Sequence, residues 1–402
     1  MTEPHNRFGR GRPTREAVLG SACAALFAVS LGISALAIPL IASAAGLNVV
    51  EIGVIVTIGA AAQLASRFAL PALTTRVRDR LLIALSGGLL ALSCILLVVE
   101  VDFTMLVIAQ IMQGAARAIF WTSSQTHAVR TSRSVVSGLA PLNFVAGVGQ
   151  AIGPLLAGVT LGISERMTMG VAAAIALAIV FPALIMASVS PTPARTRALR
   201  RQARKAVARQ NADVIPARRR LHVEWASAAP GGWRALLGSY VPIVLKEAGH
   251  TSTTIGLMVS LSSGASVIGS VVAGRAPVRA LRILIIGGCL AVGLGLAGAS
   301  VLVASAVVSG CLLALSGFGA GLVQTVGPAA AAELAGTEGH THAIIRTGTY
   351  RAAALTLAPI VVAVLAGPVT AAYAVAIAAL VVALPGTAIG PIEPPGSSAK
   401  RP

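Results

Sequence analysis

The sequence predicts an all-α membrane protein with twelve transmembrane helices in two six-helix repeats. Three observations lead to this fold class. The 402 residues are 56% hydrophobic and only 11% charged, with a mean hydropathy of +0.85, whereas soluble domains carry about 25% charged residues. Basic residues are concentrated in alternate connections between apolar runs. The apolar runs fall into two groups that are separated by one strongly basic linker.

A helix needs about 20 mainly apolar residues to cross the hydrocarbon core of a bilayer. The first apolar run starts at Ala17 and is too long for the apolar region of a signal peptide, so we interpret it as a spanning helix. No charge occurs between Ile283 and Ala332, so a turn near Gly298–Ser300 is inferred from length alone. The predicted spans are approximately 17–44, 52–73, 81–99, 103–125, 137–161, 167–189, 233–250, 253–274, 281–300, 302–329, 344–366 and 368–388.

The loop charges predict the orientation of the chain. The odd-numbered connections contain one basic residue, Arg166, whereas the even-numbered connections, the linker and both termini are rich in arginine. Basic loops remain on the cytoplasmic side of a membrane. We therefore expect a multi-pass protein of the plasma (inner) membrane with both termini in the cytoplasm. The net charge of +18 is explained by this rule, and no nucleic-acid partner is expected.

The basic linker, Pro191–Gly231, has ten Lys or Arg residues between Arg195 and Arg220 and divides the chain into similar halves. Glu51-Ile52-Gly53-Val54 resembles Thr254-Ile255-Gly256-Leu257, and each tetrapeptide starts the second span of its half. A repeat of six spans is typical of transporters, whose substrate sites lie between the halves. The predicted units are a tail at 1–16, a six-helix half at 17–190, the linker at 191–231, a second half at 232–388 and a tail at 389–402.

Polar residues inside the spans indicate a candidate substrate site. Every third span (three, six, nine and twelve) lacks ionisable residues, Asn and Gln in its interior. In the fourth span, Gln110, Gln113 and Arg117 share one helix face. Arg117 would either bind substrate in a central cavity or form an interhelical hydrogen bond. The full candidate set is Gln110, Gln113, Arg117, Asn143, Gln150, Gln324 and Arg351.

Proton coupling would require a titratable group whose access alternates between the two sides of the membrane. Glu247 and Glu51 are the carboxylates near the outer boundary that could belong to a cavity. The alternative is that both form salt bridges on the outer surface.

Several motifs resemble those of the major facilitator superfamily, across nearly the whole chain. The most specific is Gly149-x-x-x-Gly153-Pro154-x-x-Ala157-Gly158, which is similar to a signature of the drug/proton antiporters of that family. The small residues recur every four positions and would let a neighbouring helix approach closely, while Pro154 interrupts the backbone hydrogen bonds. This segment would serve as a packing seam and hinge.

A second resemblance lies in the loop after span two, where Leu73, Arg76 and Arg80 match the family's gate-loop motif and Thr75 replaces its acidic residue. The copy in the second half keeps Gly274 and Arg279. Gln113-Gly114 is similar to a third family motif, with Gln110 at the position of its arginine. The resemblance implies the major facilitator fold, with spans one, four, seven and ten lining a central cavity.

The primary hypothesis is a secondary transporter that exports small amphipathic molecules by proton-coupled alternating access, as the seam motif implies. The alternative is a carrier of organic anions with a cationic cavity formed by Arg117 and Arg351. A third hypothesis is a membrane sensor or assembly partner that has lost transport. The spans contain no catalytic or metal-ligating constellation, and the chain has no ATP-binding Walker motif. We therefore expect neither enzymatic activity nor a cofactor, and we expect a monomer that contacts lipid, a small-molecule substrate and protons.

Overall fold

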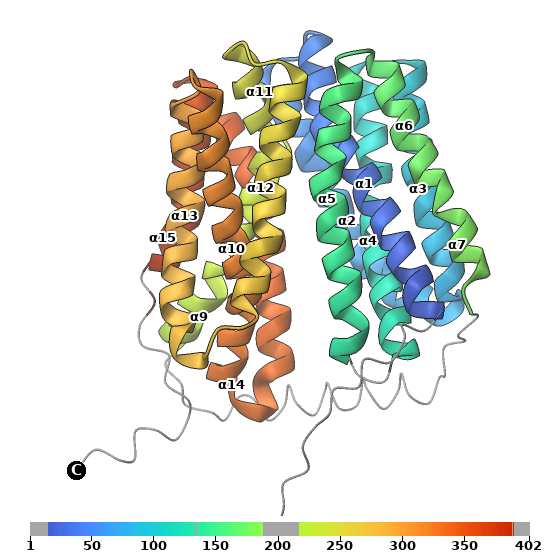
Figure 1. Ribbon diagram of the computed structural model, residues 1–402, viewed down its shortest axis with the longest axis vertical. Helices are drawn as coiled ribbons and strands as arrows, with labels where there is room; N and C mark the ends of the chain where they lie inside the picture. The colour runs from blue at the N-terminus through green and yellow to red at the C-terminus, as the bar shows by residue number, and fades with distance from the viewer. Residues whose placement is uncertain (1–14, 133–134, 188–216, 388, 390–402) are drawn as a thin grey trace, which may run out of the picture.

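The computed structural model describes residues 15–132, 135–187, 217–387 and 389. Helices joined by short connections make up this part of the chain, and no strand occurs within it. The predicted tails lie almost entirely outside the described residues, as does most of the basic linker. Figure 1 shows two groups of helices side by side, with the helix axes close to the vertical.

The first group of helices contains residues 15–187. Its helices are α1 (Arg15–Ala44), α2 (Val49–Arg76), α3 (Asp79–Val99), α4 (Phe103–Thr131), α5 (Val135–Leu161), α6 (Glu165–Ala178) and α7 (Val180–Ile185). The end that holds Arg15, Thr131 and Ala187 is called the linker end, and the end that holds Ala44, Val49 and Leu161 is called the far end. The linker end is at the bottom of Figure 1.

The second group contains residues 217–387. Its helices are α9 (Ala217–Ala226), α10 (Ala228–Leu237), α11 (Tyr240–Glu247), α12 (Ser252–Ala273), η2 (Val278–Ala280), α13 (Leu281–Val301), α14 (Ala306–Leu365) and α15 (Ala371–Thr387). Within this group, α14 packs against α10, α12 and α13, and α15 covers α13.

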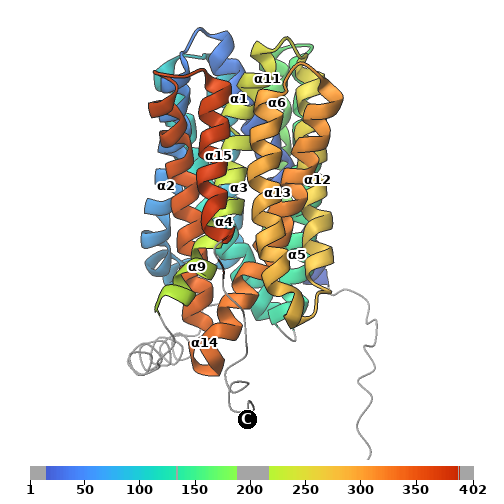
Figure 2. The ribbon, with the colours of Figure 1, turned by 90° about the vertical axis from the view of Figure 1, so that its left-hand side faces the viewer.

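Among the described residues, ten helical segments are long and apolar enough to cross a membrane, and Ala371–Leu384 forms a shorter apolar helix. The predicted spans ten and eleven belong to one helical segment, α14, which contains 60 residues. A straight helix of that length would measure about 90 Å, but α14 turns back at the linker end (Figures 1 and 2). The connection between α13 and α14 lies at residues 302–305, beyond the expected turn at Gly298–Ser300.

The predicted seventh span, 233–250, is part of a longer and interrupted segment. Helix α9 starts at Ala217 and α10 at Ala228, so both begin inside the stretch that was assigned to the linker. Gly238 and Ser239 separate α10 from α11, and Ser239 leaves the helical backbone region with φ −133° and ψ −77°. The hydropathy pattern marked only the apolar second half of this segment, because its first turns carry arginines and a glutamate.

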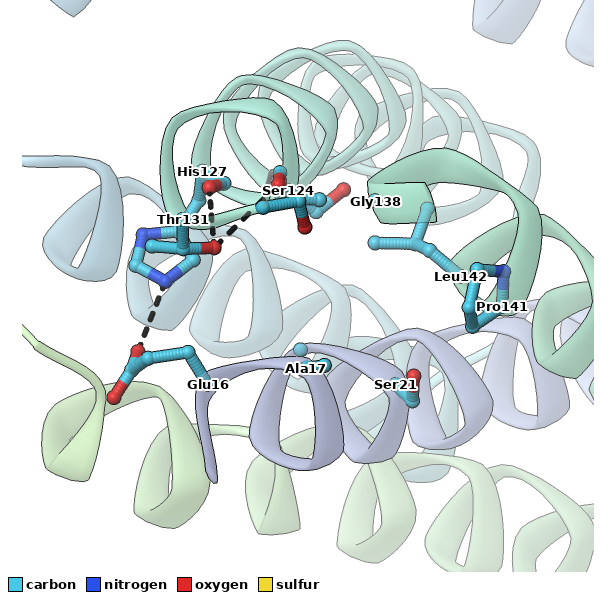
Figure 3. Close-up of a pocket in the computed structure, with 12 residues that line it drawn as sticks. Glu16, Ala17, Ser21, Ser124, His127, Thr131, Gly138, Pro141 and Leu142 are labelled. Carbon is cyan, nitrogen blue, oxygen red and sulfur yellow. Dashed lines mark hydrogen bonds and ion pairs between the residues drawn. The ribbon is translucent and has the colours of Figure 1, made fainter. Parts of the chain in front are cut away.

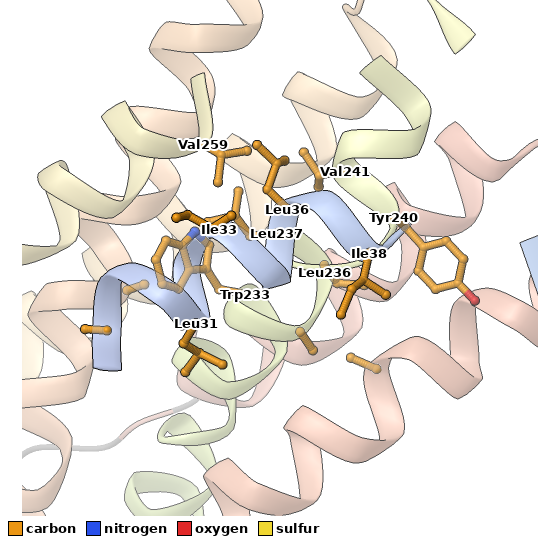
Figure 4. Close-up of a cluster of buried hydrophobic side chains, with 14 of the residues drawn as sticks. Leu31, Ile33, Leu36, Ile38, Trp233, Leu236, Leu237, Tyr240, Val241 and Val259 are labelled. Carbon is orange, nitrogen blue, oxygen red and sulfur yellow. The ribbon is translucent and has the colours of Figure 1, made fainter. Parts of the chain in front are cut away.

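An apolar cluster connects the two groups at mid-height. Leu31, Leu36 and Ile38 of α1 pack beside Trp233 of α10 and Tyr240 of α11 (Figure 4). Tyr240 is fully buried, and its hydroxyl donates to the carbonyl oxygens of Val49 and Pro359 at 3.1 and 3.3 Å. Hydrophobic burial of this kind stabilises association in proportion to area, and the tyrosine additionally ties α11 to α2 and to the second limb of α14.

Close helix contacts run along both faces of α5. A Cβ atom at Gly153 would lie 2.6 Å from the Cα atom of Gly32 on α1, and one at Gly149 would lie 2.8 Å from the carbonyl oxygen of Ala25. On the other face, a Cβ atom at Gly158 would lie 2.6 Å from the carbonyl oxygen of Ser252 on α12. Such distances leave no room for a side chain, because protein interiors are close-packed. Helix α5 therefore holds α1 within its own group and α12 of the other group.

We expect Gly153→Leu to destabilise the protein strongly, because α1 and α5 must separate to admit the side chain. Overpacking a core typically costs about 1–3 kcal/mol. Thermal unfolding of the purified protein in detergent would measure the change. Gly170→Leu is the matched control, since nothing lies within 4 Å of a Cβ atom there. Equal melting temperatures for the two variants would contradict the role of Gly153 in packing.

Candidate functional site

Arginines from both groups of helices come together near the centre of the molecule. Arg117 lies on α4, Arg234 on α10 and Arg351 on the second limb of α14. Arg234 is close enough to Arg117 and Arg351 for both charges to act on it, and the charge of Arg67 on α2 acts on Arg351. Arg117, Arg234 and Arg351 are called the arginine cluster below.

Neutral amides bind two of these guanidinium groups. Arg117 donates from Nη2 to Gln113 Oε1 at 3.3 Å, one helical turn away. Arg234 donates from Nη1 to Gln150 Oε1 of α5, so this bond crosses between the two groups of helices. The guanidinium of Arg234 also lies 5.8 Å from the ring centre of Trp233, within cation–π range. These contacts orient the arginines and leave their positive charges unneutralised.

The arginine cluster forms no ion pair with any acidic residue that the structure describes. The ion pairs found there are Arg130–Asp79 and Arg346–Glu224, and His127 Nε2 lies 3.1 Å from Glu16 Oε2. Unpaired charge inside hydrocarbon is costly, by about 2.5–3.5 kcal/mol per residue on insertion scales. A bound anion or water must therefore compensate the cluster.

The exposure of the arginines agrees with a hydrated site between the helices. Arg351 is exposed, and Arg117 and Arg234 are partly exposed. Yet the backbone carbonyl of Arg351 packs directly against Gly231 of α10, and its charge interacts with Arg67 of α2. The backbone of Arg351 thus lies against the second group of helices, and its charge acts on a residue of the first group. The Nε2 atom of Gln113, which is fully buried, has no hydrogen-bond partner and could donate to a ligand.

The other predicted site residues occupy different surroundings. Gln110 is 5% exposed, and its side chain packs against Gly59 where α2 and α4 approach each other. Asn143 is exposed on α5, and Gln324 is partly buried on the first limb of α14. The structure brings Gln113, Gln150, Arg117 and Arg351 together and shows no contact of Gln110, Asn143 or Gln324 with the arginine cluster.

The two carboxylates considered for proton coupling lie at the far end. Glu51 accepts a hydrogen bond from the backbone of Asn48 at 2.8 Å, and the Asn48 side chain accepts one from Glu51 N at 2.9 Å. This capping box fixes the start of α2. Glu247 is exposed at the last position of α11. Arg117 lies 15 residues along α4 from the cap at Asp102, or about 22 Å. The chain therefore separates both carboxylates from the arginine cluster.

The predicted gate loop is mostly helical. Helix α2 continues to Arg76, and only Val77 and Arg78 separate it from α3. Leu73 packs against an apolar group that includes Leu82 and Ile119. The side chain of Arg76 is not described. Arg80 is partly buried on α3, Gly274 caps α12, and Arg279 is exposed in η2.

An acidic residue is nevertheless present at this corner. Asp79, the first residue of α3, is 1% exposed and binds Arg130 Nη1 of α4 through Oδ2 at 2.7 Å. The family motif has its acidic residue at the position of Thr75. In the structure the ion pair is formed by Asp79, one helical turn later.

Sequence reasoning missed Arg234 and His127. Arg234 is the second residue of the predicted seventh span, 233–250, but the helical segment starts at Ala217 and places Arg234 well inside it. His127 was left outside the fourth span, which was expected to end at residue 125, but α4 continues to Thr131. The apolar sequence Ala-Ala-Pro-Gly-Gly-Trp that precedes Arg234 could have indicated that the spanning helix starts earlier and encloses this arginine.

No group of three or more His, Cys, Asp or Glu residues that could hold a metal ion occurs in the described ranges.

Comparison with known families identifies the class of protein. The family model described as Major Facilitator Superfamily matches residues 20–359. The chain therefore belongs to the Major Facilitator Superfamily, and it is a membrane transporter rather than an enzyme. No curated protein matches the sequence significantly.

Solved transporter structures share the fold at low sequence identity. A POT family transporter in complex with a thioalcohol-conjugated peptide has a TM-score of 0.71 and 13% identity, covering 92% of this chain and 94% of its own. A bacterial homologue of the human lysosomal transporter Spinster, inward-facing and unoccupied, has a TM-score of 0.70 and 11% identity, covering 94% of both chains. The nucleoside transporter NupG has a TM-score of 0.67 and 10% identity, and the match covers 93% of this chain and 97% of NupG.

We expect Arg130→Ala to destabilise the protein by about 3–5 kcal/mol, because it leaves the buried carboxylate of Asp79 without its partner. Thermal unfolding in detergent would report the loss. Combining Arg130→Ala with Asp79→Asn removes the stranded charge and should recover much of the stability. If the double variant is no more stable than Arg130→Ala alone, the ion pair does not carry this energy.

Proposed function

We propose that this transporter carries organic anions, with the arginine cluster as its substrate site. The observation that carries the proposal is the convergence of Arg117, Arg234 and Arg351 from both groups of helices without a carboxylate partner. Guanidinium groups bind carboxylates and phosphates through paired, charge-assisted hydrogen bonds. A substrate with one or two such groups would neutralise the cluster and connect α4 with α10 and α14.

Alternating access follows from the arrangement of these contacts. In the described residues, contacts that join the two groups include Gly158–Ser252 and Tyr240–Val49 towards the far end, and Arg234–Gln150 nearer the middle of the helices. Figure 1 shows α5 and the turn of α14 lying apart at the linker end. We propose that the linker end faces the cytoplasm, because basic connections are retained there, and that substrate reaches the arginines from that side in this conformation. The bond between Arg234 and Gln150 would open or exchange when substrate binds.

The second candidate is proton-driven export of amphipathic molecules from a monomeric carrier in the plasma membrane. The spacing of Gly149, Gly153 and Gly158 supports it, because that seam resembles the antiporter motif. The lack of an acidic residue beside the arginine cluster in the described part of the chain weighs against cationic substrates, since a cation there would meet only like charge. The anion hypothesis therefore explains the uncompensated positive charge of the arginine cluster, which the export hypothesis does not explain.

Transport into proteoliposomes tests the proposal. We expect wild-type protein to accumulate one or more of succinate, benzoate and inorganic phosphate, and to exclude tetraphenylphosphonium. Arg117→Gln and Arg351→Gln should lower kcat/KM about tenfold to a hundredfold, because a hydrogen bond to a charged group contributes about 1.5–3 kcal/mol. Their melting temperatures should remain close to that of the wild type.

Arg275→Gln is the matched control, because Arg275 is exposed beyond α12 and donates to the carbonyl oxygen of Val271 on its own helix. This variant should transport normally. Accumulation of tetraphenylphosphonium in everted vesicles under a pH gradient, abolished by a protonophore and unaffected by Arg117→Gln, would overturn the anion proposal in favour of export by proton antiport.

A further inference from the structure

Three aromatic rings form a group on α1 and α4, next to the arginine cluster. Phe120 of α4 stacks on Phe27 of α1, with ring centroids 3.9 Å apart and an interplanar angle of 3°. Trp121 meets both rings edge to face, with its centroid 5.3 Å from Phe120 and 6.2 Å from Phe27. Phe27 and Phe120 are fully buried, whereas Trp121 is partly exposed. Trp121 is therefore the member of this group that a ligand can contact.

Trp121 and Arg117 share one face of α4. Successive helical residues are rotated by about 100°, so Trp121, four positions after Arg117, lies about 40° from it around the helix axis. Two apolar residues that are exposed elsewhere on α4, Ile111 and Ile108, lie about 80° and 140° from Trp121 by the same count. The charge of Arg117 acts on Arg234 of α10. The shared face is therefore turned towards the second group of helices.

The neighbours of α4 place the indole ring more closely. A side chain at Gly114 would clash with the backbone of α2 at Gly59, so this side of α4 is closed by α2. Trp121 follows Gly114 by seven residues, or about two turns, and so starts on nearly the same side of the helix. Its ring nevertheless reaches Phe27 of α1. The indole consequently lies across the strip of α4 between α2 and α1, which is also the strip that holds Arg117.

The direction of the side chains sets the order of these groups along the helix. Helical side chains lean towards the N-terminus of their helix, which for α4 is the far end. Arg117 follows this rule, because it donates to Gln113 one turn nearer the far end. The ring of Trp121 then covers the turn of Arg117 on its linker-end side. A substrate that enters from the linker end would meet Trp121 before it reaches the guanidinium groups.

The second tryptophan beside the arginine cluster is enclosed. Trp233 is 2% exposed, and its Nε1 atom donates to Ser316 Oγ at 3.1 Å. For the indole N–H of Trp121, no acceptor is found among the residues that the structure describes. Buried indole N–H groups usually bind an acceptor, so that of Trp121 is left to water or to a ligand.

Two contacts hold α1 against α4 around the ring group. One is the stack of Phe27 on Phe120. The other lies about two turns nearer the linker end, where His127 Nε2 of α4 is 3.1 Å from Glu16 Oε2 of α1 (Figure 3). The helices that position Trp121 are thus tied together at two levels. A ring that is already oriented binds a ligand at a smaller entropic cost than a mobile one.

We propose that the preferred substrates of this transporter are aromatic carboxylates, which bind the arginine cluster through their carboxylates and pack their ring on Trp121. This inference rests on the proposed function and specifies the substrate class of the same site. One helical turn, about 5.4 Å, separates Arg117 from Trp121 along α4, and a carboxylate joined to a ring spans that distance. Aromatic pairs gain affinity beyond the area that they bury. An aliphatic anion would bind the same arginines and leave the indole uncovered.

Uptake of three matched dianions into proteoliposomes tests this substrate class. Phthalate, cis-cyclohexane-1,2-dicarboxylate and succinate each carry two carboxylates on adjacent carbons or on the ends of a two-carbon unit, and uptake is measured at pH 8 above that of protein-free liposomes. We expect kcat/KM for phthalate to exceed that for its saturated analogue by about threefold to tenfold. Trp121→Leu should remove this preference and change kcat/KM for succinate less than twofold, whereas Trp121→Phe should keep most of the preference.

Trp225→Leu is the matched control. Trp225 is 43% exposed on α9, and its ring lies 5.3 Å from that of Tyr350. This variant should keep the preference for phthalate. Equal kcat/KM values for phthalate and its saturated analogue, or a preference that survives in Trp121→Leu, would overturn the inference and leave anion transport in place.

Tryptophan emission gives a second readout that needs no transport and no loss of folding. In protein reconstituted into lipid nanodiscs and excited at 295 nm, phthalate should change the emission of the wild type and of Trp225→Phe. The change should be largely lost in Trp121→Phe, and succinate should produce little change in any of the three proteins. An equal response in the wild type and Trp121→Phe, or no response in either, would contradict contact with Trp121. Absence of uptake of all three dianions would overturn the proposed function, and the emission would still decide whether aromatic anions bind at Trp121.

Discussion

Charge compensation inside an apolar helix bundle is the constraint on which the rest of this structure depends. A guanidinium placed among hydrocarbon side chains must be paired, hydrated or bound to a ligand. In the described residues, Asp79 binds Arg130, Glu224 binds Arg346 and Glu16 binds His127, and these contacts lie at the linker-end side of the molecule. In the same part of the chain, Arg117 and Arg234 of the arginine cluster bind amides, and no carboxylate partner is found for the cluster. This difference is the basis for proposing the arginine cluster, and not the paired charges, as the substrate site.

The helix packing places this charge between the two groups of helices. Helix α5 approaches both α1 and α12 at distances that exclude a Cβ atom, and α10 and α11 pack their apolar side chains against α1. The interruption at Gly238–Ser239 lies one turn beyond Arg234. Interrupted helices are frequent at transporter sites, because their ends supply unpaired backbone groups and allow local movement. Arg234 and Tyr240 thus lie on either side of this interruption, and each makes a contact with the first group of helices.

The two carboxylates at the far end, Glu51 and Glu247, occupy a helix cap and an exposed helix end. A carboxylate at either place is separated from the arginine cluster by much of the length of the helices, so it compensates none of the cluster's charge.

The sequence alone determined the class of protein and much of its site. Apolar length specifies spanning helices, because an unpaired backbone polar group is too costly in lipid, and the family prediction from the motifs in α5 is confirmed for the superfamily. Arg117, Gln113 and Arg351 were recognised because charge and amides are rare in such helices. Only the tertiary structure placed Arg234 beside them and Glu16 against His127, residues 111 positions apart in the chain. Hydropathy measures only the average environment of a segment. It could not show that α9, α10 and α11 form one interrupted segment. It also could not show which charged residues of different helices lie close together.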